Sequence, residues 1–179
     1  MTTIDPKEAA QALNDIEQIV QRVRQSRIYD IASQIMIAAG VLVLAGNVAN
    51  FLTPRHASYI WITVNVLNVA TAAALSTMGG RQIGVRFDFR MLAAFVLFFA
   101  FGILCSGVFG HYGPREMGAF WPIYFMLFYC IAGLWFGRAF MAIGLGIIVL
   151  TLIGYFFVEG AAFLLWMAAV NGGGLILSG

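Results

Sequence analysis

Residues 31–52 have the sequence IASQIMIAAGVLVLAGNVANFL, which is apolar along its length apart from isolated hydroxyl and amide side chains. No charged residue interrupts it. A helix needs about 20 mostly apolar residues to cross the hydrocarbon core of a bilayer. The stretch therefore predicts a transmembrane helix.

Five more stretches of the same kind follow along the chain, and none of them contains a charged residue. With the first, the predicted spans are residues 31–52, 59–78, 91–110, 119–136, 139–158 and 161–178. The chain of 179 residues is 61% hydrophobic and 10% charged, whereas a soluble domain carries about 25% charged residues. The sequence thus predicts an all-α polytopic membrane protein, with a six-transmembrane-helix bundle over residues 30–179.

The polar residues 1–29 before the first span begin with the signals of a helix start. Asp5 is a natural N-cap, Pro6 suits the first helical position, and Glu8 completes a capping box. Apolar residues then recur at spacings that place them on one helix face. They are Ala9, Leu13, Ile16, Val20 and Val23, of which the last four are called the stripe below. We expect an amphipathic helix whose stripe lies on the membrane surface, packs on the bundle, or pairs with another helix.

The lysines and arginines predict the orientation, because cytoplasmic loops carry an excess of them. Eight lie before the first span or after the second and fourth spans: Lys7, Arg22, Arg24, Arg27, Arg81, Arg86, Arg90 and Arg138. Arg55 and Arg115 lie on the other side. We therefore expect a multi-pass protein of the cell (inner) membrane with both termini, and the amphipathic helix, in the cytoplasm. Residues 1–28 lack the apolar centre of a secretory signal peptide, so we expect them to be retained.

Asparagines in the first two spans form the most informative polar pattern. Asn47 and Asn50 share a helix face, as do Asn65 and Asn68 in the next span. Amides are costly in hydrocarbon, so all four are expected to point into the bundle. They either bond across the hairpin, at about 0.6 kcal/mol per contact, or line a ligand pocket that opens outward. We expect the bonded arrangement and keep the four residues as the candidate ligand-binding site.

Asn171 adds a fifth amide, deeper in the membrane, and is followed by three glycines. Glycines at such a place either kink a helix or let another backbone approach closely. The sequence predicts one of these two features in the last span.

Residues suited to catalysis or metal binding are scarce. The spans hold no Asp, Glu, Lys, Arg or His for acid–base work. His56 and His111 lie in outer loops, but a zinc site usually takes three or more protein ligands. We predict no catalytic residue, no metal site and no cofactor. The net charge of +2 is too small to indicate nucleic acid as a partner.

These features favour a non-enzymatic accessory or binding subunit of a membrane complex. The expected partners are the lipid bilayer and either a membrane or cytosolic protein or further copies of this chain, with the stripe as the candidate partner-binding surface. The alternative is a small transporter or an outward-facing solute-binding component that uses the four asparagines. An enzyme acting on lipid is disfavoured, because charged groups are missing from the spans.

Overall fold

The structure is a computed structural model, and it describes residues 6–83, 89–108, 110 and 112–179. All regular structure in these residues is helical, which confirms the all-α prediction for this part of the chain. The long helices are α1 (Pro6–Leu52), α2 (Ala57–Ile83), α3 (Phe89–Val108), α4 (Pro114–Phe136) and α5 (Arg138–Phe157). The 3-10 turn η1 (Pro54–His56) joins α1 to α2. The C-terminal rod consists of α6 (Ala162–Met167), the π-helical segment η2 (Ala168–Gly173) and α7 (Gly174–Ser178) in direct succession.

Prolines and glycines set several of the helix ends. Pro54 and Pro114 lie in first helical turns, where a missing backbone N–H removes no intrahelical bond. Gly137 has a φ of 131° between α4 and α5, and Gly160 has a φ of 63° between α5 and α6. Side chains are strained at such angles, so glycine permits these two reversals of the chain.

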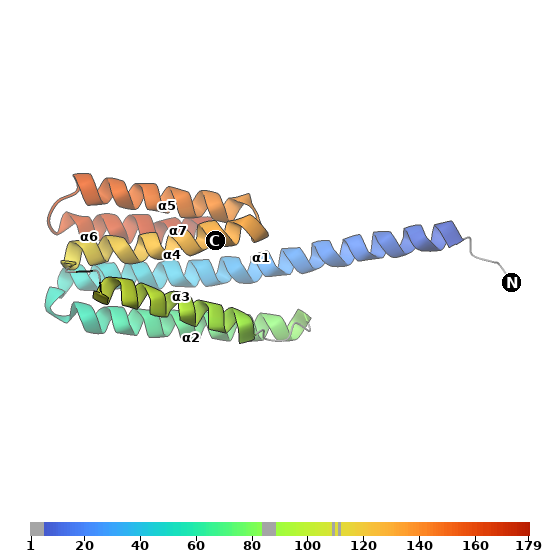
Figure 1. Cartoon of the computed structure of the whole chain (residues 1–179), viewed down its shortest axis with the longest axis horizontal. Coiled ribbons are helices and arrows are strands. Elements are labelled where there is room, and N and C mark those ends of the chain that lie inside the picture. The colour runs from blue at the N-terminus through green and yellow to red at the C-terminus, as the bar shows by residue number, and fades with distance from the viewer. Residues whose placement is uncertain (1–5, 84–88, 109, 111) are drawn as a thin grey trace.

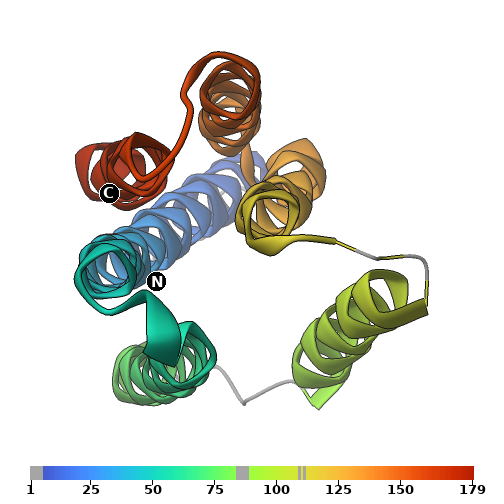
Figure 2. The ribbon, with the colours of Figure 1, turned by 90° about the vertical axis from the view of Figure 1, so that its left-hand side faces the viewer.

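α1 is the central helix of the bundle. It packs on α2 along one side and on the C-terminal rod along another, while α5 contacts both this rod and α4. α3 adjoins α4 at the edge (Figure 1, Figure 2). The N-terminal part of α1 projects from the bundle as a single helix (Figure 1). We call the end of the bundle from which it projects the near end, and the opposite end, which contains η1, the far end.

The core lies where α1, α4, α5 and the C-terminal rod meet. Its buried residues are Met36, Met126, Ile147, Val170 and Leu175. Most large apolar side chains of α2, α3 and α5 are instead exposed on the outside of the bundle. An apolar exterior of this kind suits lipid as the surrounding solvent.

α1 and the C-terminal rod approach each other so closely that no side chain would fit at Gly40 or Gly172. A Cβ atom on Gly172 would lie 2.5 Å from the Cβ of Leu44, and one on Gly40 would lie 2.7 Å from the carbonyl oxygen of Gly172. Small residues allow membrane helices to associate in this way. The glycine run after Asn171 therefore admits another backbone, as expected, and it coincides with the π-helical segment.

Stacked aromatic rings hold α3 to α4. The ring of Phe98 lies 4.1 Å from that of Tyr124, whose hydroxyl donates a hydrogen bond of 2.6 Å to the Phe98 carbonyl. The ring of Phe99 lies 5.4 Å from that of Trp121. Gly102 makes room for these rings, since a Cβ there would lie 2.8 Å from Tyr124. The aromatic residues of α3 and α4 thus fill the space between the two helices.

Four helical stretches are long and apolar enough to cross a membrane. They are Tyr29–Leu52, Pro54–Met78, Pro114–Leu134 and Arg138–Phe157. Ala93–Val108 and Ala162–Ser178 are apolar but shorter within the described residues. These lengths indicate a membrane protein, while the third and sixth predicted spans stay predictions.

Candidate functional sites

The stripe on the N-terminal part of α1 is exposed along its whole length. Leu13, Ile16, Val20 and Val23 are each between 57% and 61% exposed. Ile19, which the sequence analysis left out, is 61% exposed and widens the stripe, because it lies one turn from Ile16 and Val23. In the structure, therefore, the stripe does not pack on the bundle.

α1 passes from the stripe into the bundle without a break. Its 47 residues correspond to a rod of about 70 Å. Residues 7–39 contain no glycine and no proline, which are the usual causes of a sharp kink. The predicted boundary near residue 29 thus lies inside one helix, and the division into residues 1–29 and 30–179 stays a prediction.

The four predicted ligand-binding asparagines lie on the packed helices α1 and α2. Asn47 is buried, and the other three, Asn50, Asn65 and Asn68, are half-buried. The Asn47 amide nitrogen donates to the Val43 carbonyl at 2.9 Å, and that of Asn65 to the Trp61 carbonyl at 2.8 Å. Each of these bonds runs within one helix, whereas the sequence analysis expected bonds across the hairpin. The carbonyl four residues back is within reach without ordering a second helix. As a ligand-binding site the four residues stay a prediction.

A pocket of about 310 Å³ opens at the near end of the bundle, between α1, α5 and the end of the C-terminal rod. Its lining includes Tyr29, Asp30, Ser33, Phe140, Ile143 and Ser178. The Ser33 hydroxyl donates to the Gly179 carbonyl, and the Tyr29 and Phe140 rings stack 5.9 Å apart. None of the predicted site asparagines lines this pocket, which lies where α1 leaves the bundle.

Arg115 joins three elements at the far end. Its guanidinium donates to the backbone carbonyls of Tyr155 at 2.5 Å and Val158 at 2.7 Å, at the end of α5. The same group lies 5.5 Å from the centre of the Tyr155 ring and 5.1 Å from that of Phe163. The sequence analysis used Arg115 only for orientation. The signal for its role was a cation just before the fourth predicted span, because the last carbonyls of a helix need donors.

Thr151 and Asn171 are polar residues buried inside the bundle, on α5 and on η2. Thr151 is 0% exposed and Asn171 is 4% exposed. Within the part of the chain that the structure describes, Thr151 Oγ1 and Asn171 Oδ1 are buried atoms without a hydrogen-bond partner. The sequence analysis did not single out Thr151, although it is a hydroxyl in an otherwise almost wholly apolar predicted span.

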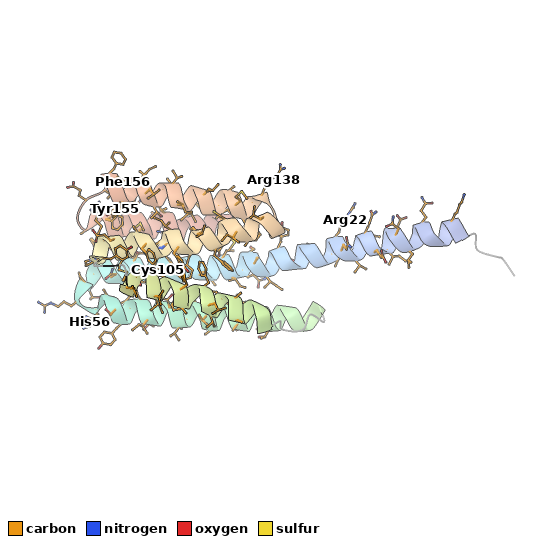
Figure 3. The ribbon with its side chains drawn as sticks, in the orientation of Figure 1. Arg22, His56, Cys105, Arg138, Tyr155 and Phe156 are labelled. Carbon is orange, nitrogen blue, oxygen red and sulfur yellow. The ribbon has the colours of Figure 1, made fainter. Side chains whose placement is uncertain are left out.

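His56 lies at one end of the bundle, and Arg22 and Arg138 lie toward the other. Figure 3 shows His56 with Tyr155 and Phe156 at the far end, and Arg138 at the near end, toward which Arg22 also lies. His111 is outside the described residues. Among the residues that the structure describes, no three His, Cys, Asp or Glu side chains form a group suited to holding a metal ion.

Comparison of the chain with protein-family models, with curated proteins and with solved structures gives no match in any of the three. The exposed stripe, the asparagines, the Arg115 contacts and the buried polar pair are therefore interpreted from their own chemistry.

Proposed function

We propose that this chain is a non-enzymatic subunit of a membrane complex that binds a cytosolic protein through the stripe on α1. In this proposal the bundle crosses the inner membrane six times, with both termini in the cytoplasm. One observation carries it, namely an exposed apolar face on a helix that leaves the bundle. Exposed apolar patches of this kind mark interaction surfaces.

The continuity of α1 favours a protein over lipid as the occupant of the stripe. Residues 6–28 extend about 35 Å beyond the stretch Tyr29–Leu52 that is suited to crossing the membrane. For the stripe to lie on the bilayer surface, the helix would have to turn sharply. Because residues 7–39 contain no glycine or proline, the usual causes of a sharp kink, a straight helix that carries the stripe away from the membrane surface is favoured.

The spacing of the stripe favours a helical groove on the partner. Leu13, Ile16, Val20 and Val23 recur at the three- and four-residue intervals by which an amphipathic helix fills an apolar groove. Burying a Val, Leu or Ile side chain fully contributes about 1.5–3 kcal/mol, so these half-exposed residues supply several kcal/mol together. Pairing with the same stripe of a second copy is weaker, because two heptads are too short for a stable coiled coil.

The test compares two double variants in the full-length protein. Ile16→Asp with Val20→Asp places two carboxylates on the stripe, whereas Gln11→Asp with Gln18→Asp places the same charges on the opposite face. A photo-crosslinking residue at Val23 captures whatever contacts the stripe in the native membrane, and gentle purification with native mass spectrometry gives partner and copy number. We expect one stoichiometric cross-linked protein with the wild type and the glutamine control, and none with the stripe variant.

The melting temperature of the purified bundle should be the same for all three proteins, since the stripe makes no contact with the bundle. A cross-link only to lipid contradicts the proposal. So does a product of twice the chain mass of 19.5 kDa, which shows self-association, or a partner that persists with the stripe variant.

A further inference from the structure

Thr151 behaves differently from other threonines of this chain. The hydroxyls of Thr53 and Thr63 donate to the carbonyls four residues back, Ala49 at 2.8 Å and Tyr59 at 2.9 Å. Such bonds let a helical hydroxyl satisfy itself in an apolar surrounding. Thr151 is fully buried, yet its Oγ1 has no such partner among the described residues. Its hydroxyl is therefore available to a group outside α5.

Asn171 differs in the same way from the other buried asparagine. Asn47 donates to a backbone oxygen, whereas the Asn171 amide nitrogen reaches only the sulfur of Met167 at 3.6 Å, which is a weak acceptor. The Asn171 Oδ1 atom is buried without a donor in the described structure. Asn171 also lies in the π-helical segment η2, and π-helical turns occur frequently at functional sites.

Three contacts place these residues on facing stretches of α5 and the C-terminal rod. Toward the far end, the Trp166 indole nitrogen donates to the Leu150 carbonyl at 2.9 Å, and a Cβ on Gly154 would lie 2.2 Å from Trp166. Toward the near end, a Cβ on Gly174 would lie 3.3 Å from Ile147. Thr151 lies within residues 147–154 of α5, and Asn171 lies within residues 166–174 of the rod. Both therefore lie in the section where the two helices pack together.

The chemistry of the pair and its surroundings selects the ligand. A hydroxyl that both donates and accepts and an amide oxygen that accepts are complementary to a molecule with two O–H donors and two lone pairs. The buried residues that the structure describes include no Asp or Glu, so a cation here would lack a compensating charge. A neutral molecule of the smallest size fits this requirement.

We propose that a single water molecule is bound between α5 and η2. It donates one hydrogen bond to Asn171 Oδ1 and makes a second hydrogen bond with Thr151 Oγ1. Buried waters typically satisfy polar groups of this kind and are costly to remove. The water couples the π-helical segment to α5. This inference is independent of the proposed partner, since neither residue belongs to the stripe.

Thr151→Val tests the inference, because valine keeps the shape and removes only the hydrogen-bonding group. With a bound water, the change leaves Asn171 Oδ1 unpaired and should raise the ratio of unfolded to folded protein in mixed micelles by about five- to thirtyfold. In a dry site, it removes an unpaired hydroxyl and should stabilise the protein or leave it unchanged. Thr63→Val, on the exposed face of α2, is the control and should have little effect.

NMR of the asparagine-labelled full chain identifies the water directly. We expect the side-chain amide of Asn171 to show a cross-peak to a long-lived water in the wild type and to lose it in Thr151→Val. The double variant Thr151→Val with Asn171→Leu, which removes both polar groups, should be no less stable than either single variant. A Thr151→Val protein that is as stable as the wild type, or no water cross-peak in a folded wild type, overturns the inference.

Discussion

At the scale of single residues, several polar side chains of this protein bond to backbone carbonyls. Asn47 and Asn65 use carbonyls of their own helices, whereas Arg115 of α4 uses those at the end of α5. The last carbonyls of a helix have no intrahelical donors, and a cation there also interacts favourably with the helix dipole. Arg115 thus supplies hydrogen-bond donors to the end of α5, which the apolar side chains around it cannot do.

Replacing Arg115 should therefore destabilise the bundle. Arg115→Met keeps much of the length and apolar contact of the side chain but removes the bonds to Tyr155 and Val158. We expect a loss of about 1.5–3 kcal/mol in the free energy of unfolding, as for hydrogen bonds to charged groups. Unfolding in mixed detergent micelles measures it.

The matched control is Arg55→Met, because Arg55 is exposed in η1 at the same far end and no bond of this kind is seen for it among the described residues. Its free energy of unfolding should change by less than about 0.5 kcal/mol. Equal effects of the two substitutions would contradict a specific role for Arg115 and point to a general effect of outer charge.

At the scale of elements, α1 organises the bundle through its contact with the C-terminal rod. The contact depends on Gly40 and Gly172, where each backbone fills the space that a side chain on the other would need. The π-helical segment lies at the same place. Close packing, the unusual helix geometry and the buried Asn171 therefore coincide in one short part of the chain.

Gly172→Ala should force α1 and the rod apart. The new Cβ would meet Leu44 at 2.5 Å, and its backbone atoms at 2.7 Å, so a flexible side chain cannot simply move aside. Overpacking of this kind costs about 1–3 kcal/mol. Thermal unfolding in detergent should show a lower melting temperature.

Gly173→Ala is the control at the neighbouring position, where a new Cβ meets nothing within 4 Å. Alanine also has the higher helix propensity, by about 1 kcal/mol. The melting temperature of this variant should stay the same or rise. If the two variants have the same melting temperature, whether below or above that of the wild type, the close contact at Gly172 does not limit stability.

At the scale of the whole molecule, residues that the sequence analysis assigned to opposite sides of the membrane lie toward opposite ends of the bundle. Arg22 and Arg138 lie toward the near end, and His56 lies at the far end (Figure 3). The excess of lysine and arginine in the segments before the first span and after the second and fourth spans gives the proposed orientation. The stripe on α1 extends from the near end, so the same orientation places it in the cytosol.

Topology reporters test this orientation. A reporter fused at Gln11 or after Gly179 should give a cytoplasmic signal, and one inserted near Arg55 should give an exterior signal. The physical reason is the retention of basic segments on the cytoplasmic side. Opposite signals from the fusions at Gln11 and after Gly179 would mean an odd number of spans, and an exterior signal at Gln11 would place the stripe outside the cytosol.

The helices could be predicted closely from hydropathy, and their packing could not. α5, for example, spans Arg138–Phe157 against the predicted 139–158, and α1 and α4 end where the predicted spans end. The stripe was also visible in the sequence, because its period is a property of one helix. The roles of Arg115 and Thr151 were not, since each depends on the backbone or side chains of another helix.

The sequence by itself determined that this is a chain of apolar helices with an amphipathic helical segment before the first apolar span. Bilayer thickness and the 3.6-residue period act on each segment separately, so local composition is enough. Only the tertiary structure decided that the stripe lies outside the bundle, that the Asn47 and Asn65 amides bond within their own helices, and that Thr151 and Asn171 are buried inside the bundle. The burial of Thr151 and Asn171 depends on how far each helix is rotated about its axis toward its neighbours. That rotation results from packing between residues far apart in the chain, such as Gly40 with Gly172.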